Sequence, residues 1–397
     1  MSSRLSYVWL ATRLGLGAAA ANGLLRALGS PEAVFAADRR ALTTIEACPL
    51  RKAQVDVLCD KDTDEAARII EQCAKDGIQI ITLGDSAYPD RLRAIEDPPV
   101  VLYVRGRWPD FDVTPGIAVV GTRDASPYGL HTAENIGATL GRAGFITVSG
   151  MALGIDGAAH RGALRAGGLT VAVLAGGADV CYPPKHRGLM GDILLAGAVI
   201  SEYPPGTEPR GDHYHARNRI ISGLSVASVI VEAADYRSGA LITARAALDQ
   251  GRDVYAVPGA LDAPQSAACN ALIEKGEAAL LRSPEALVRT YRGLLPKTGH
   301  LSVPAHPAAK RAPVKPRPAP QTTEKQTEKT AQAAAASRLS GDERHIFELV
   351  QAGAGTPEEL IERCGLPAPR VMSLVTMLEI DGVLRREKGR LVPGRME

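Results

Sequence analysis

The chain has 397 residues, enough for two or three domains, and a formal net charge of +2 that neither requires nor excludes a polyanionic partner. Hydrophobic residues make up 45% of it and aromatic residues only 4%, so we do not expect a nucleic-acid platform built from many stacked rings. The six cysteines form no C-x-x-C pair, which argues against a zinc site and against a disulfide framework. We also expect no cofactor. The absence of a long apolar run predicts a cytoplasmic protein without membrane contact.

Short helices separated by glycines are predicted for the first 75 residues, over 5–14, 18–28, 31–37 and 64–75. Strands are predicted over 79–82 and within 97–106, and we expect them to extend the sheet that follows. The turn L-G-L-G at 14–17 resembles helical hairpins that touch nucleic-acid backbones. An ordinary connection between two helices is the simpler interpretation of this turn.

Two glycine-rich turns follow the next two predicted strands. The strand over 117–120 leads into Gly121-Thr122-Arg123 and a helix that starts at Ser126, and the strand over 145–148 leads into S-G-M-A-L-G and a second helix. In an open parallel sheet both turns would lie at the strands' carboxyl ends, where ligands bind and helix N-termini present unpaired N–H groups. Together with Arg123, these turns favour phosphate binding, although each turn alone could be structural. The dinucleotide and P-loop patterns are absent.

Further strands over 170–174, 199–202, 226–232 and 253–257 alternate with helices. This alternation predicts an α/β fold with a Rossmann-like, doubly wound parallel sheet. We divide the chain into a helical module of SAM or helix-hairpin-helix type (1–75), an extended Rossmann-like domain (76–290), a proline-rich basic linker (291–338) and a winged-helix-like domain (339–397).

The predicted winged-helix-like domain has three short helices and a two-stranded ribbon. Its expected recognition helix over 368–380 carries only Arg370 as a cation. Contact with a protein is therefore at least as well supported as reading of a DNA groove.

Polar and cationic residues follow most of the predicted strands. If they share one sheet edge, they would line a groove with more phosphate contacts than a mononucleotide requires, whereas surface ion pairs are the alternative for any single arginine. The candidate binding residues are Gly121, Thr122, Arg123, Ser126, Ser149, Gly150, Lys185, Arg187, Arg217, Asn218, Arg219, Ser238 and Gly239.

A catalytic role would need an acid, a base or a nucleophile near these residues. Glu202 and Glu232 each follow a strand, as the carboxylate of a Rossmann-like nucleotide hydrolase would, but pairing with Arg217 or Arg219 is the simpler role for both. That hydrolase remains the alternative function.

Two other catalytic patterns are incomplete. Ser149, Asp156 and His160 lie within twelve residues of one another without a G-x-S-x-G motif, and His213 and His215 lack a third metal ligand. Neither pattern therefore makes a convincing catalytic site.

The region from about 88 to 279 resembles the DNA-processing protein A family, also called DprA or Smf. The motifs that carry the resemblance are VVGTR (119–123), SGMALGID (149–156), AH (159–160), YP (182–183), SEYPPG (201–206), RNRIISGLS (217–225), VEA (231–233), SGALITA (238–244) and VPG (257–259). The helical module and the winged-helix-like tail also resemble accessory domains of this family.

The resemblance implies a single-stranded DNA-binding recombination mediator. Members of the family protect incoming DNA during natural transformation and load the RecA recombinase onto it, without catalysis. The resemblance implies DNA contacts at Gly121, Thr122, Arg123 and Lys185, and a homodimer formed through NALI (270–273), with Leu272 and Ile273 in the interface.

Three positions depart from the family pattern. His186 stands where the family commonly has Asn, HYH (213–215) replaces the usual Phe-Pro, and AA (267–268) occupies a stretch that normally contains Gly. The first two changes are expected to alter base contacts without abolishing phosphate binding.

Overall fold

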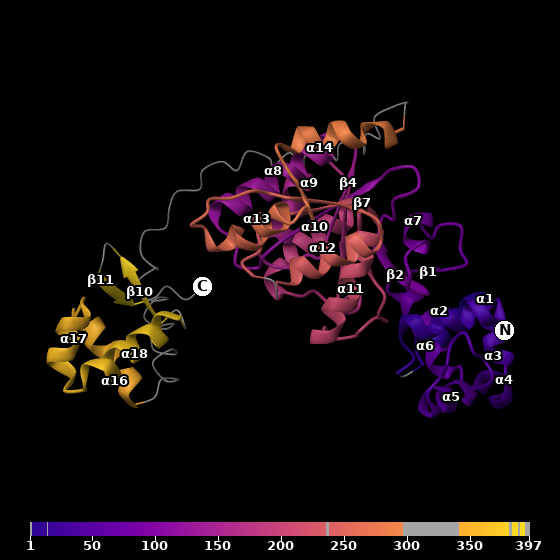
Figure 1. Ribbon diagram of the computed structural model, residues 1–397. Helices are drawn as coiled ribbons and strands as arrows, with labels where there is room; N and C mark the ends of the chain where they lie inside the picture. Colours follow the sequence, from indigo (N-terminus) through magenta and orange to yellow (C-terminus); the bar gives the residue numbers. More distant parts are fainter. Residues whose placement is uncertain are drawn as a thin grey trace, which may run out of the picture. The chain divides into compact units, whose positions relative to one another are not determined.

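The structure, a computed structural model, describes residues 2–13, 15–235, 238–296, 341–380, 383–387 and 390–393. The chain forms two compact units, Met1–Ala308 and Ala309–Glu397, and each is described by itself. The first unit contains a helical module followed by a large sheet with helices on both faces (Figure 1). Among the described residues, no helix has both the length and the apolar character needed to span a bilayer.

Six helices form the N-terminal module, and three of the four predicted ones begin and end within a residue of their expected limits. Side-chain caps at Ser30 and Asp38 start the third and fourth helices. Trp9, Leu24 and Leu58 are buried in a core that also includes residues of the first two strands, so the predicted boundary at 75/76 lies inside one packed unit. The helices are α1 (Ser3–Ala11), α2 (Gly17–Leu28), α3 (Pro31–Ala36), α4 (Arg39–Thr43), α5 (Lys52–Cys59) and α6 (Asp64–Lys75).

Nine strands form one mixed sheet, in the order β1-β2-β6-β5-β4-β3-β7-β8-β9. All neighbouring pairs from β6 to β9 along this order are parallel, as predicted, while β1 and β2 add antiparallel pairs at one edge and thus extend the sheet. The strands are β1 (Gln79–Thr82), β2 (Val101–Gly106), β3 (Gly116–Val120), β4 (Ile146–Ser149), β5 (Thr170–Val173), β6 (Ala198–Ser201), β7 (Ser225–Ile230), β8 (Asp253–Ala256) and β9 (Ala279–Leu280).

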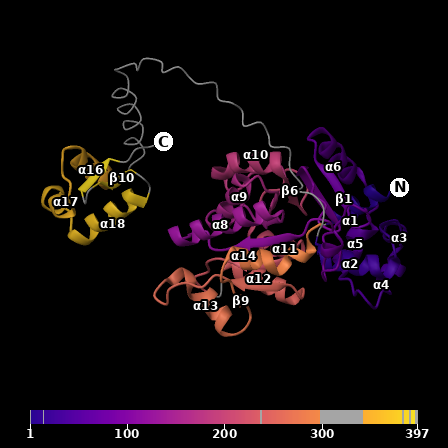
Figure 2. The same ribbon diagram turned by 90° about the horizontal axis from the view of Figure 1, so that it is seen from above.

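Helices cover both faces of the sheet because the buried strands are apolar on both sides. Ile117 and Val119 of β3 belong to one core with α8, α9 and α14, whereas Ala118 and Val120 belong to another with α11, α12 and α13. Figure 2 shows α8, α9 and α10 on the opposite side of the sheet from α11, α12 and α13. The helices are α7 (Asp90–Arg93), α8 (Pro127–Ala143), α9 (Ile155–Arg165), α10 (Arg187–Ala196), α11 (Gly211–Gly223), α12 (Gly239–Asp249), α13 (Ala267–Glu274) and α14 (Pro284–Tyr291).

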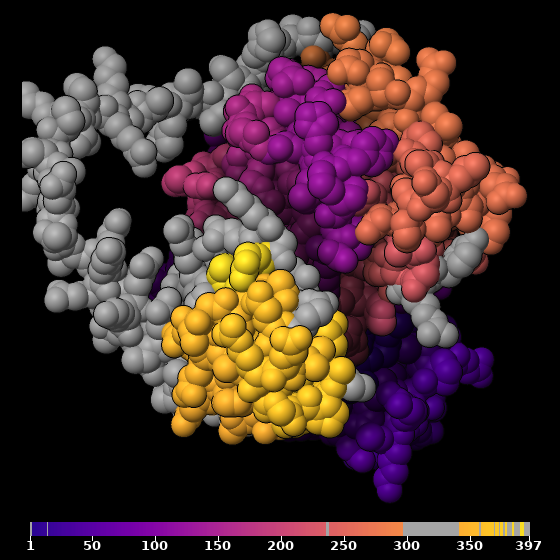
Figure 3. Space-filling view, turned by 90° about the vertical axis from the view of Figure 1, so that its left-hand side faces the viewer, coloured from indigo at the N-terminus to yellow at the C-terminus, as the bar shows by residue number. Residues whose placement is uncertain are grey.

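The last part of the first unit completes this layer. Helix α14 packs against α8, and the orange surface near 284–291 borders the purple surface of α8 in the space-filling view (Figure 3). The sequence did not predict β9 or α14, which extend the domain to its expected end near residue 290.

The order of the strands reverses between β3 and β7. From β3 the chain adds β4, β5 and β6 on one side, and then returns to place β7, β8 and β9 on the other side. In open α/β sheets such a switch point lies outside the carboxyl ends of the two central strands and is the usual place for a ligand. Both predicted glycine turns therefore belong to the edge where binding is expected.

The second unit has the three helices and the hairpin that the sequence predicts. Its core includes Ile346, Phe347, Leu360, Val371 and Leu391, and Thr356 caps α17 by accepting a hydrogen bond from the Glu359 amide. Most of the predicted linker, 297–338, lies outside the described residues. The elements are α16 (Gly341–Gln351), α17 (Pro357–Cys364), α18 (Ala368–Ile380), β10 (Leu384–Glu387) and β11 (Arg390–Pro393).

Candidate nucleic-acid interface

The first glycine turn carries an exposed arginine. The Thr122 amide is already used, because it donates to the Glu232 carbonyl at 2.8 Å, and the Thr122 hydroxyl accepts from the Asp124 amide at 3.2 Å. The Arg123 guanidinium lies over the ring of Tyr214, 4.9 Å from its centroid, and among the described residues it has no acidic partner. Arg123 is therefore a free cation beside the switch point.

The second glycine turn is closed by a buried carboxylate. Asp156 accepts hydrogen bonds from the amides of Gly150 at 3.1 Å and Ala152 at 3.4 Å, and the Ser149 hydroxyl donates to the Val119 carbonyl at 2.6 Å. The prediction that this turn presents free N–H groups is wrong at Gly150 and Ala152. Both amides already donate to the carboxylate of Asp156, which belongs to α9, the helix that follows the turn. The Ser149 hydroxyl is buried and cannot serve as a nucleophile.

The two turns touch each other, as the predicted shared edge requires. Gly154 has φ +74°, and a Cβ at this position would lie 2.3 Å from the Thr122 carbonyl oxygen, so only glycine fits. The next residue, Ile155, donates its amide to the same carbonyl at 3.2 Å. The first turn therefore rests directly on the second.

Arg217 lies beneath the second turn rather than on the surface. It is 5% exposed, donates to the Val173 carbonyl, and fills the space where a Cβ on Gly150 would come within 1.9 Å of its Nη1. Burial lowers the pKa of the Arg217 guanidinium and raises the pKa of Asp156, while the attraction between these two groups opposes both shifts. Arg217 thus supports the turn from inside and is not accessible to a nucleic acid.

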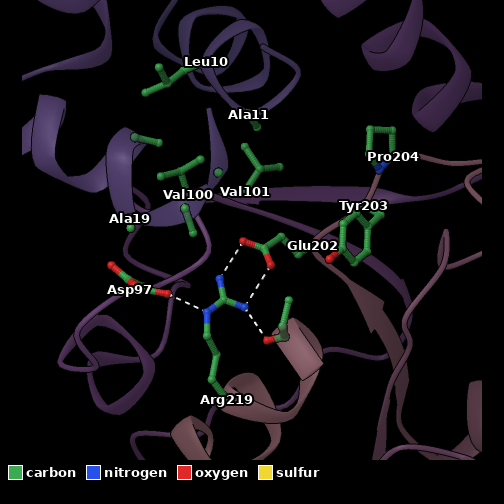
Figure 4. Close-up of a pocket in the computed structure, with 14 residues that line it drawn as sticks. Leu10, Ala11, Ala19, Asp97, Val100, Val101, Glu202, Tyr203, Pro204 and Arg219 are labelled. Atoms are coloured by element: carbon green, nitrogen blue, oxygen red, sulfur yellow. Dashed lines mark hydrogen bonds and ion pairs between the residues drawn. The ribbon is translucent and has the colours of Figure 1, made fainter. Parts of the chain in front are cut away.

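Arg219 forms the ion pair that was predicted for Glu202. Its Nη1 and Nη2 donate to the two Glu202 carboxylate oxygens at 2.9 and 2.7 Å, and its Nε donates to the Asp97 carbonyl at 2.9 Å (Figure 4). Burial disfavours the charge on Arg219, but attraction to Glu202 outweighs it and leaves the arginine pKa raised. The pair lines a cavity of about 390 Å³ between α1, α2 and α11, yet both carboxylate oxygens are engaged.

Glu232 occupies the switch point itself. It follows β7, is 1% exposed, and accepts hydrogen bonds from the Ser126 amide at 2.9 Å and from the Ser126 hydroxyl. Ser126 also caps α8 by accepting from the Gly129 amide at 3.1 Å. The expected pairing of Glu232 with Arg217 or Arg219 is wrong, because β7 lies beside β3 and the start of α8 reaches the carboxylate first. Glu232 therefore closes the crevice instead of facing a substrate.

Two further exposed cations lie in the segment after β5. Lys185 belongs to a short 3-10 turn, Pro184–His186, and Arg187 begins α10. Neither side chain has a hydrogen bond or an ion pair within the part of the chain that the structure describes. The His186 ring is buried and its Nδ1 lies 2.9 Å from the Met151 carbonyl oxygen, so this segment is fastened to the second glycine turn.

Other predicted residues are structural or lie at the margin of this edge. Asn218 is buried and donates to the Gly239 carbonyl at 3.1 Å, while Ser238 and Gly239 form the start of α12. Leu272 is 4% exposed and packs in the core, whereas Ile273 is half-buried. Among the described residues, no three His, Cys, Asp or Glu side chains are grouped to hold a metal ion.

Sequence reasoning missed two tyrosines at this surface. Tyr182 is 48% exposed, and its ring centroid lies 6.3 Å from that of Tyr214, the ring under Arg123. The low aromatic content directed attention away from them, although Tyr182 stands three residues before a predicted cation. We call Arg123, Tyr182, Lys185, Arg187 and Tyr214 the strand-end surface.

Comparisons with known proteins match both units. Residues 79–292 fit the family model of DNA recombination-mediator protein A, and residues 329–390 fit that of the DprA winged helix domain. A DNA processing protein DprA of Mycobacterium tuberculosis is 35% identical over 343 residues, covering 83% of this chain and 80% of that protein.

Solved structures also resemble the chain. The X-ray structure of DNA processing protein A from Streptococcus pneumoniae has 33% identity and a TM-score of 0.63, covering 73% of this chain and 98% of that one. A structure concerned with the single-stranded DNA binding mode of the Helicobacter pylori protein has 30% identity and a TM-score of 0.49, covering 54% of this chain and 96% of that one.

Proposed function

The chain belongs to the DNA-processing protein A (DprA/Smf) family, and from this premise we propose that it is a single-stranded DNA-binding recombination mediator. Membership gives it a role in DNA processing. In the proposal, it holds incoming single-stranded DNA in the cytoplasm during natural transformation, protects it and loads RecA onto it. It does so as a homodimer and without a catalytic step.

The observation that carries the proposal is the set of free cations on the strand-end surface. Arg123, Lys185 and Arg187 are exposed, and none has an acidic partner among the described residues. A cation that is not already neutralised can bind a phosphate and release the counterions condensed on the DNA, which is the main source of affinity for a nucleic-acid backbone.

The predicted binding residues take different parts in this proposal. Direct phosphate contacts are assigned to Arg123, Lys185 and Arg187, with Ser238 and Gly239 at the start of α12 as further contacts. The remaining candidates keep structural roles in this proposal: Gly121, Thr122, Ser126, Ser149, Gly150, Arg217, Asn218 and Arg219.

The proposed dimer uses the exposed apolar residues near the last strand of the sheet. Leu261 is 98% exposed and Leu280 is 45% exposed, and Ile273 on α13 is half-buried. Leu272, from the same helix, would support this surface from the core. Apolar side chains left in water at an edge strand favour association with a second copy.

The alternative function, nucleotide hydrolysis, has less support. Glu202 is held at both oxygens by Arg219, and Glu232 is buried against Ser126. A general acid or base must reach its substrate within hydrogen-bond distance. In this arrangement neither carboxylate is free to do so.

The proposal is tested by fluorescence anisotropy with a labelled 20-nucleotide strand, with and without duplex competitor, followed by assembly of RecA on the same strand. We expect tight single-strand binding that duplex displaces poorly, and faster RecA assembly when the protein is present. Absence of binding at moderate salt by the folded protein would overturn the proposal. Binding without an effect on RecA assembly would overturn the loading step.

A further inference from the structure

The Tyr182 side chain is an exposed ring on a fixed support. It is 48% exposed, although an aromatic ring of this size gains free energy by burial. The segment that carries it is anchored by the buried His186, whose Nδ1 lies 2.9 Å from the Met151 carbonyl oxygen. A ring held in water by a rigid segment is preorganised to cover another flat, apolar surface.

Tyr214 supports this ring from one side. The two centroids are 6.3 Å apart and the ring planes meet at 59°. Insertion of a flat group between two rings needs a parallel gap of roughly 7 Å, because each stacked layer takes about 3.5 Å. The gap is too narrow and too tilted, so any stacked partner must lie on the outer face of Tyr182.

Cations flank the pair of rings. The Arg123 guanidinium lies 4.9 Å from the Tyr214 centroid, and Lys185 follows Tyr182 by three residues. A single-stranded nucleic acid alternates phosphates and flat bases, and proteins that bind it combine cations with stacking rings. An arginine over one ring and a lysine three residues after the other provide the two kinds of group that this alternation needs.

We propose that Tyr182 stacks against one nucleobase of the bound strand and that Tyr214 is a positioning residue that links this ring to Arg123. The inference rests on the proposed single-strand binding and adds a requirement for an unstacked base. A base in a duplex has both faces covered by its neighbours, and it must be unstacked before Tyr182 can reach it. Stacking at Tyr182 therefore gives the surface a preference for single strands that phosphate contacts alone would not supply.

The test compares fifteen-nucleotide dT with an abasic strand of the same length and charge, at one salt concentration. The wild type is expected to bind dT on the order of tenfold more tightly than the abasic strand. Tyr182→Ala should remove most of this ratio while leaving abasic binding within about twofold, and Tyr182→Phe should keep it. Tyr214→Ala should reduce the ratio and also weaken abasic binding, because Arg123 loses the ring beneath it.

Leu195→Ala, a truncation at a 68% exposed residue of α10, is the matched control and should change neither affinity. Equal binding of dT and abasic strand by the wild type, or equal loss of both in Tyr182→Ala, would overturn the inference and leave phosphate binding intact. Failure of the wild type to bind either strand would instead overturn the proposed function. Tyr182→Trp provides a second check, since a larger ring should bind dT at least as tightly as tyrosine.

Discussion

Two pairs of basic residues, which the sequence places in the same predicted groove, differ in the structure in their exposure and their partners. Arg123 and Lys185 are exposed and have no acidic partner in the described part of the chain, whereas Arg217 is buried under a glycine turn and Arg219 is bound to Glu202. The difference shows that a position near a strand end does not make a cation available to a ligand. A cation is available to a ligand only where it is not already bound to a carboxylate or a carbonyl of the protein itself.

The largest expected effect comes from removing one of the two arginines with partners inside the protein. Arg219→Ala leaves Glu202 partly buried without its partner, and we expect the free energy of unfolding to fall by about 3 kcal/mol. Urea unfolding followed by circular dichroism measures this loss. The slope of DNA affinity against salt should stay at the wild-type value in the fraction that remains folded.

A matched double variant identifies the cause of that loss. Glu202→Leu combined with Arg219→Met removes both charges and fills a similar volume, so most of the lost stability should return. If the double variant is as unstable as Arg219→Ala, packing rather than the unpaired carboxylate is responsible.

The second prediction concerns pH and the buried groups near Arg217. Burial, and to a smaller extent the nearby His186, Arg161 and Arg217, lower the pKa of His160 from 6.5 to about 3. Below pH 6.5 the unfolded chain binds a proton that the folded chain does not, so His160 makes stability fall as pH decreases from 6.5 towards 3. Between pH 6.5 and pH 5 this loss should reach about 2 kcal/mol.

Urea unfolding at these two pH values, compared between wild type and His160→Gln, isolates this contribution. The variant should lose less stability than the wild type on acidification. Parallel losses in both proteins would assign the pH dependence to groups other than His160, and not to Asp156, whose raised pKa favours the folded chain on acidification.

The third prediction concerns the exposed pair. Arg123→Ala or Lys185→Ala should weaken single-strand binding about tenfold each, because a charge-assisted contact with a phosphate is lost. The free energy of unfolding should change by less than about 0.5 kcal/mol, since among the described residues neither cation pairs with an acidic group or hydrogen-bond acceptor that its loss would leave unsatisfied. Anisotropy titrations and urea unfolding on the same samples test both statements.

Arg245→Ala is the control for these variants. Arg245 is also exposed, but it pairs with Asp249 within α12, and its loss should leave DNA affinity unchanged within about twofold. An equal effect at Arg245 would mean that general charge, and not the strand-end surface, governs binding.

The smallest expected effect is at Glu232. Glu232→Gln keeps the shape but places an amide where two donors of Ser126 need acceptors, so we expect a loss of stability of about 1 kcal/mol. Release of free base from nucleotide monophosphates should be undetectable in the wild type as well as in the variant. Hydrolysis by the wild type that disappears in Glu232→Gln would restore the enzymatic alternative.

Local signals explain which parts of the fold could be predicted. Helix α8 has its expected limits because Ser126 and Pro127 start it and Gly144, at φ +90°, ends it. Helices α4 and α5 are only five and eight residues long, and β9 has two residues, so periodicity is too short to reveal them.

The candidate site was predicted less completely, because burial of its side chains depends on distant contacts. Arg219 is tied to the carbonyl of Asp97, 122 residues earlier, and Arg217 to that of Val173. The local sequence places these two arginines beside an apolar helical run and Arg123 in a turn, but it does not show which internal acceptors reach them. The tyrosines were missed for a related reason, since the spacing of 32 residues between Tyr182 and Tyr214 gives no sign that their rings meet.

The central claim is that the free cations at the strand ends, and not the buried ones, hold the DNA backbone. The most direct test is the slope of log affinity against log salt for a single strand, measured for the wild type and for Arg123→Ala combined with Lys185→Ala. Each lost phosphate contact should flatten the slope by about 0.7, so the double variant should differ by about 1.4. An unchanged slope would contradict the account and place the DNA elsewhere on the chain.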